Sequence, residues 1–91
     1  MVGDKIGGID FYSADGSGAG VKGSISYIAS TAGSGGVTAM TFNTATSTVN
    51  NVERMRIAST GNVGIGTASP GAAYKLEVNG LLKANGGYFT N

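Results

Sequence analysis

Short runs of alternating apolar and polar residues recur along the chain, separated by stretches rich in glycine, serine, threonine and asparagine. Residues two apart lie on the same face of an extended strand, so each run predicts a strand with one apolar face. The first four runs span residues 5–12, 21–29, 37–43 and 52–58. Loops of about seven or eight residues separate these four runs. This spacing is typical of an antiparallel meander and not of strand–helix–strand units.

The alternation also predicts which residues share a face. In the second run Ile25 and Tyr27 face away from Ser24 and Ser26. In the third run, Met40 and Phe42 lie opposite Val37, Ala39 and Thr41, and in the first, Ile9 and Phe11 lie opposite Ile6, Asp10 and Tyr12. No window has a convincing apolar period of 3.6 residues, so we expect little or no helix, with at most one turn near residues 72–76.

Three shorter strand patterns follow one another between residues 53 and 80. Their apolar members are Met55, Ile57, Val63, Ile65, Leu76 and Val78. Each pattern offers only two apolar side chains on a face, which is too few for a core, so each needs a partner surface. After residue 60 the strands shorten and glycine recurs every two to five residues. We therefore divide the chain into a small antiparallel β unit, residues 1–60, and a slender glycine-rich segment, residues 61–91.

This part of the chain carries a specific resemblance. The strings Glu-Arg-Met-Arg-Ile (53–57), Gly-Asn-Val-Gly-Ile-Gly-Thr (61–67), Ser-Pro (69–70) and Lys-Leu-Glu-Val-Asn-Gly (75–80) occur in that order. Together they resemble the shaft segment of bacteriophage tail fibres, which often precedes a C-terminal self-cleaving chaperone domain. The similarity covers about half of the chain. The chaperone domain and its catalytic residues are not in this sequence, so the resemblance implies no self-cleavage.

The resemblance implies an intertwined, parallel homotrimer in which identical side chains meet around a threefold axis. Met55, Ile57, Val63, Ile65, Leu76 and Val78 would then form stacked apolar layers. Gly64 and Gly66 would let the chains approach closely. Glu53, Arg54 and Arg56 would form ion pairs between subunits, or would simply be a solvated strand face.

Composition narrows the function classes. The net charge is +1 with 12% charged residues, which gives no electrostatic footprint for nucleic acid or an anionic membrane. No apolar run approaches the length of a transmembrane helix. Glycine makes up 17 of 91 residues, far above the usual share of about 7%. Glycines inside strand patterns weaken the strands, and a close-packed subunit interface would offset that cost.

The residues that carry chemistry argue against an enzyme. Histidine and cysteine are both absent, which removes the common nucleophilic triads and zinc sites. The carboxylates, Asp4, Asp10, Asp15, Glu53 and Glu77, form no recognisable catalytic pair and too few of them cluster for a calcium loop. Gly64 to Gly66 fails the context of a dinucleotide-binding loop, because no helix follows. We therefore predict no enzyme activity, cofactor or metal. The tyrosines Tyr12, Tyr27, Tyr74 and Tyr88 are more typical of packing residues than of a sugar site.

The sequence thus predicts an all-β structural component of a phage tail fibre, located in the virion. Its partners would be further copies of itself and other fibre or virion proteins, with host glycans bound by other parts of the fibre. The alternatives are the stalk of a bacterial surface adhesin and a fragment of a polysaccharide-degrading tailspike. Neighbouring genes would distinguish a phage fibre from an adhesin, since tail genes favour the first and secretion genes the second. A small monomeric β-sandwich is the purely structural alternative.

Overall fold

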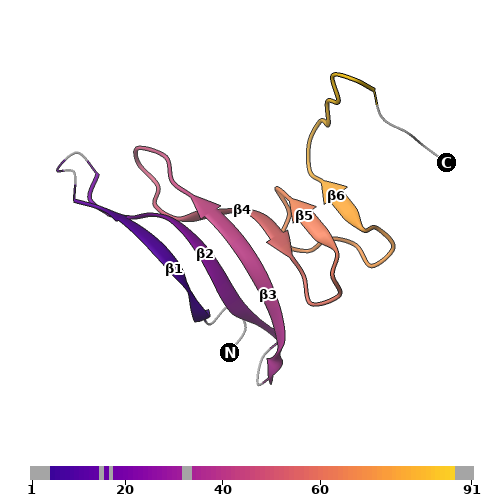
Figure 1. The fold of residues 1–91 in the computed structure, drawn as a ribbon, viewed down its shortest axis with the longest axis horizontal. Helices are drawn as coiled ribbons and strands as arrows, with labels where there is room; N and C mark the ends of the chain where they lie inside the picture. Colours follow the sequence, from indigo (N-terminus) through magenta and orange to yellow (C-terminus); the bar gives the residue numbers. More distant parts are fainter. Residues whose placement is uncertain (1–4, 15, 17, 32–33, 88–91) are drawn as a thin grey trace.

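A computed structural model describes residues 5–14, 16, 18–31 and 34–87, and every regular element within them is a β-strand. The six strands are β1 Lys5–Ser13, β2 Gly20–Thr31, β3 Ser34–Thr44, β4 Val52–Ile57, β5 Val63–Ile65 and β6 Leu76–Val78. They lie side by side in one sheet in chain order, with β1 at one edge and β6 at the other (Figure 1). The prediction of an all-β meander without helices is therefore confirmed for the described residues.

Strand pairing is antiparallel from β1 through β5, whereas β5 and β6 pair in parallel. The first two loops of the meander are shorter than the sequence predicts. The predicted loop over residues 30–36 is shorter, because β2 reaches Thr31 and β3 begins at Ser34. Thr31 pairs with Ser34, which extends the β2–β3 pairing beyond the residues where the sequence alternates. Residues 32–33 lie outside the described residues.

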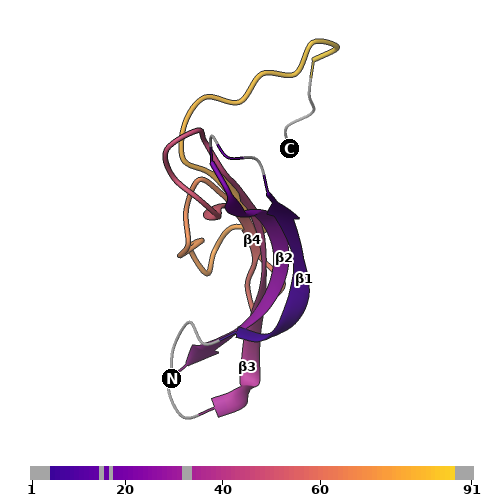
Figure 2. The ribbon, with the colours of Figure 1, turned by 90° about the vertical axis from the view of Figure 1, so that its left-hand side faces the viewer.

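The sheet is a single curved layer, seen edge-on in Figure 2. The molecule measures 50 × 38 × 17 Å, so it is thin in one direction. A β-sandwich needs a second sheet packed face to face about 10 Å away, and all the described strands belong to one sheet. The only buried hydrophobic residues among those described are Ala29 and Ala39. The described part of the chain is therefore a sheet without an apolar core, and not a sandwich.

The division predicted near residue 60 falls between β4 and β5. The strands before it have 6 to 12 residues, and the two after it have three each. Strand pairing nevertheless continues across this point, because β4 pairs with β5. The two segments therefore share one sheet in spite of their different character.

Candidate assembly surface

Apolar side chains form a continuous row across the sheet. Residues directly opposite each other on paired strands project from the same face. The strand register links one such residue from each strand to the next, and we call this row the first ladder: Ile9, Ile25, Phe42, Met55, Ile65 and Val78. The first ladder crosses all the strands with an apolar side chain at every step.

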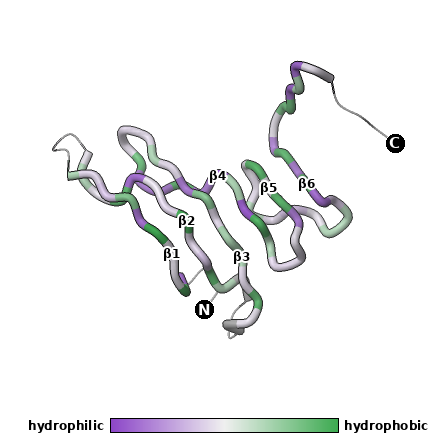
Figure 3. Tube along the Cα trace, viewed as in Figure 1, coloured by the Kyte–Doolittle hydropathy of each residue, from purple (hydrophilic) through white to green (hydrophobic). Residues whose placement is uncertain are grey.

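A second row runs beside the first, two residues away along each strand. The second ladder consists of Gly7, Tyr27, Met40, Ile57, Val63 and Leu76. Because the side-chain period of a strand is two, both ladders lie on the same face of the sheet. We call this the ladder face, and Figure 3 shows the alternation of hydrophobic and hydrophilic residues along the strands that produces it.

The ladder face is largely uncovered. Ile9 at one end of the first ladder is 58% exposed, Ile65 is 40% exposed, and Leu76 in the second ladder is 51% exposed. Neither ladder contains a charged residue. A contiguous exposed apolar surface of this kind marks an interaction site, since water solvates it poorly.

All the residues predicted to form the apolar layers lie on the ladder face. Met55, Ile65 and Val78 are consecutive members of the first ladder, and Ile57, Val63 and Leu76 are consecutive members of the second. The sequence prediction of the layers did not include the contributions of β1, β2 and β3, although the alternation in those strands indicated their apolar residues. Which residue stands opposite which depends on strand register, and alternation alone does not fix register.

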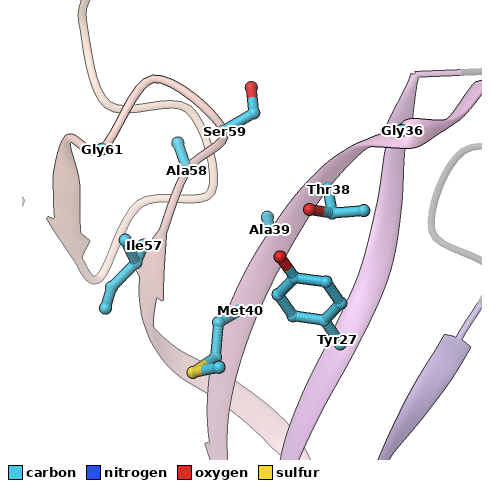
Figure 4. Close-up of a pocket in the computed structure, with 9 residues that line it drawn as sticks. All are labelled: Tyr27, Gly36, Thr38, Ala39, Met40, Ile57, Ala58, Ser59 and Gly61. Carbon is cyan, nitrogen blue, oxygen red and sulfur yellow. The ribbon is translucent and has the colours of Figure 1, made fainter.

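A shallow hollow of about 330 Å³ opens on the same face, between the ends of β3 and β4. Tyr27, Met40 and Ile57 of the second ladder line it together with Thr38 and Ser59 (Figure 4). No carboxylate, amine or guanidinium group lines it. The hollow is therefore a dent in the ladder face that offers apolar contact and a few hydroxyl groups.

The opposite face of the sheet is polar and is hydrogen-bonded within the chain. Ser24 Oγ donates to Asn51 Oδ1 at 2.7 Å, and Asn43 Nδ2 donates to Ser24 Oγ at 2.7 Å. Ser26 and Thr41 are also buried on this side. These bonds hold the loop of residues 45–51 against the sheet, where it satisfies buried polar groups. The chain thus covers part of its polar face and leaves its ladder face open.

Gly64 is a site of close packing, and the backbone that approaches it belongs to the same chain. The residue is buried on the polar face, between Val63 and Ile65. A Cβ atom at this position would lie 2.6 Å from the Thr67 carbonyl oxygen and 3.3 Å from Pro70 Cδ. The connection between β5 and β6 therefore packs on Gly64, which gives this glycine a role within one chain, whereas we predicted an approach between chains.

Hydrogen bonds close the connection of residues 66–75 onto the strands beside it. Asn62 Nδ2 donates to the Gly71 carbonyl oxygen at 3.3 Å, and the Gly71 amide donates to Glu77 Oε1 at 2.9 Å. Gly66 has a φ of 76°, in the left-handed region that favours glycine, and lies where the chain turns out of β5. Gly64 and Gly66 thus fit a connection that packs on the polar face and returns the chain to pair with β5 in parallel.

The three predicted ion-pairing residues have partners within the chain. Arg56 Nε and Nη2 donate to the two carboxylate oxygens of Glu53 at 2.9 and 2.7 Å. These residues lie on the same face although they are three apart, because the register shifts between Phe42 and Asn43 opposite them. Arg54 Nε donates to Thr44 Oγ1 at 2.8 Å. Pairing of these charges between subunits stays a prediction.

We expect the Glu53→Gln variant to lose about 1 kcal/mol of unfolding free energy, because the bidentate ion pair is only partly exposed to solvent. Chemical denaturation in low salt measures the loss, which should shrink in 1 M NaCl as the charges are screened. Lys83→Gln, which changes an exposed charge, serves as the control. A Glu53→Gln variant with normal unfolding but weaker self-association would instead favour pairing between subunits.

Other chemistry is sparse among the described residues. Nowhere in them do three His, Cys, Asp or Glu side chains lie close enough to hold a metal ion. Within that part of the chain no helix has the length and apolarity needed to cross a membrane. Asp10 forms an ion pair with Lys5 at the exposed edge strand β1. Asp4, Asp15 and Tyr88 lie outside the described residues.

No model of a known protein family matches the sequence, and no curated protein matches it either.

Proposed function

We propose that the chain is a structural segment of a phage tail fibre shaft and that it works as a parallel homotrimer in the virion. The observation that carries the proposal is the ladder face, an apolar surface that crosses every strand and that the described chain leaves open. A structure with no apolar core of its own needs a partner surface of equal apolarity, and further copies of the same chain supply one.

The course of the chain supports a role in a rod. Each strand lies next to the one before it, so the chain enters the sheet at β1 and leaves it at β6, on the opposite edge (Figure 1). Segments of this kind can follow one another along a fibre, because neither end of the chain has to return to its starting point. The function is then mechanical, with the segment spacing a receptor-binding part from the rest of the virion.

The resemblance in residues 53–80 is the reason for proposing three copies of the chain in each assembly and a phage fibre as its setting. In this proposal the partners are two further copies of the chain and the neighbouring segments of the fibre. Host glycans would be bound elsewhere in the fibre, since the hollow on the ladder face becomes part of the subunit interface.

We expect sedimentation equilibrium of the purified chain to give a mass three times that of the 9.0 kDa monomer at micromolar concentration. The reason is the apolar area that each copy otherwise exposes to water. The mass should persist in 1 M NaCl, because burial of apolar surface does not depend on charge. A folded monomer under these conditions would refute the proposal.

A further inference from the structure

We propose that the threefold axis of the assembly runs across the strands, parallel to the two ladders, so that each ladder position forms a layer of three identical side chains. This inference rests on the proposed homotrimer and specifies how its copies meet. The interaction surface is the ladder face, and its occupant is the ladder face of two further copies.

An axis along the sheet could run in two directions, either parallel to the strands or across them. An axis parallel to the strands would lie over one or two of them, and a single strand contributes few apolar residues: Met55 and Ile57 from β4, for example, or Val63 and Ile65 from β5. An axis parallel to the first ladder meets an apolar residue on every strand. Around a narrow threefold axis, only an axis parallel to the first ladder removes all the side chains of that ladder from water.

Hydrogen-bonded polar groups lie on the face of the sheet opposite the ladders. Between the two ladders, the strands carry a row of residues that project from the opposite face. This row contains Ser26, Thr41, Arg56 and Glu77, and each of these side chains forms a hydrogen bond within the chain. The loop of residues 45–51 and the β5–β6 connection also lie on that side (Figure 2). With the ladders at the axis, the Glu53–Arg56 ion pair, Glu77 and the β5–β6 connection stay at the surface of the rod, and no ladder position carries a charge into the interface.

An axis across the strands also fixes the order of the strands along the rod. Because the strands follow one another in chain order, their sequence across the sheet becomes their sequence along the axis. Neighbouring strands are spaced by about 4.8 Å, so each copy occupies roughly 24 Å of the rod. A threefold axis keeps all copies parallel, so Ile9 meets Ile9 at one end and Val78 meets Val78 at the other.

Cysteine cross-linking tests this arrangement, because the sequence contains no cysteine and every introduced thiol is unique. Single variants Ile25→Cys, Phe42→Cys and Ile65→Cys place a thiol in three different layers. A short bismaleimide should join copies of each variant into covalent dimers. Each layer holds three thiols and a cross-link joins two of them, so at most about two thirds of the chains become dimers. Ser69→Cys, in the connection on the opposite side, should give almost none.

A mixed experiment tests the parallel order. Ile25→Cys chains and Ile65→Cys chains that carry a mass tag are refolded together and cross-linked. The two positions are three strand spacings apart, about 14 Å, so mixed dimers should be rare compared with dimers of each variant alone. An antiparallel arrangement would favour the mixed product.

The outcomes separate this inference from the proposed function. A trimeric mass with no cross-linking in any of the three layers, or with predominant mixed dimers, would overturn the axis and leave the trimer standing. A monomeric mass for the unmodified chain would remove both. Where a layer variant fails to assemble, Val63→Cys in the second ladder keeps a side chain of similar volume and should cross-link if the axis is right.

Discussion

The Ile65→Asp variant should dissociate the trimer, with self-association weakened about 1000-fold or more at pH 7. Ile65 is a member of the first ladder and is 40% exposed in the single chain, so folding of one copy tolerates a polar residue there. In the trimer three carboxylates would meet in one layer. Buried unpaired charges and like-charge contacts each cost several kcal/mol, and 1.4 kcal/mol corresponds to a tenfold change in affinity. Sedimentation velocity across a concentration series measures the effect.

Ser69→Asp is the matched control for the added charge. Ser69 is exposed and lies in the β5–β6 connection, which packs on the polar side of the sheet at Gly64. The same carboxylate should there leave the trimer intact. Ile65→Val, which removes one methylene from the layer, should retain the trimer with a loss of about 0.5–1.5 kcal/mol per chain. Equal tolerance of Ile65→Asp and Ser69→Asp would contradict an apolar layer at this position.

The Gly64→Ala variant should be strongly destabilised, by about 2–3 kcal/mol of unfolding free energy per chain. Its Cβ would lie 2.6 Å from the Thr67 carbonyl oxygen, which is a backbone atom and cannot rotate away. Relief requires the connection to move, and overpacking of this kind typically costs 1–3 kcal/mol. Thermal unfolding of the assembled protein measures the change in midpoint.

Gly86→Ala is the control for the loss of a glycine. Gly86 is exposed, and a Cβ added there would meet nothing within 4 Å. The change should be neutral or stabilising by a few tenths of a kcal/mol, since alanine restricts the unfolded chain. A Gly64→Ala variant as stable as Gly86→Ala would show that the connection does not pack on β5 as described.

Strand β5 contributes to two surfaces at once, because successive side chains of a strand point to opposite faces of the sheet. Val63 and Ile65 project onto the ladder face, where they continue both ladders. Gly64 projects to the other side, where its missing side chain admits the β5–β6 connection. Alternation of large apolar residues with glycine therefore combines an assembly surface with a tight intrachain turn in a few residues.

The sequence predicted the members of the candidate site on β4, β5 and β6, and it did not predict that β1, β2 and β3 extend the same rows. The period of two placed Met55 with Ile57, and Val63 with Ile65, on one face of their own strand, because a strand fixes which of its side chains point together. The resemblance to fibre shafts suggested that these faces form shared layers. That these residues continue rows begun by Ile9 depends on register across the whole sheet. The position of Gly64 was predicted as a close approach, but the approaching backbone is that of its own chain.

The sequence by itself determined the approximate positions of the strands, the absence of helical periodicity and the apolar face of each strand, because these follow from local alternation and turn residues. Only the tertiary structure decided that the strands form one open layer, that β6 pairs in parallel with β5, and that a bulge brings Glu53 beside Arg56. Those features depend on which strands pair and in what register. Strand pairing depends on interactions between segments that are far apart in the sequence, and the pattern within any one segment does not encode it.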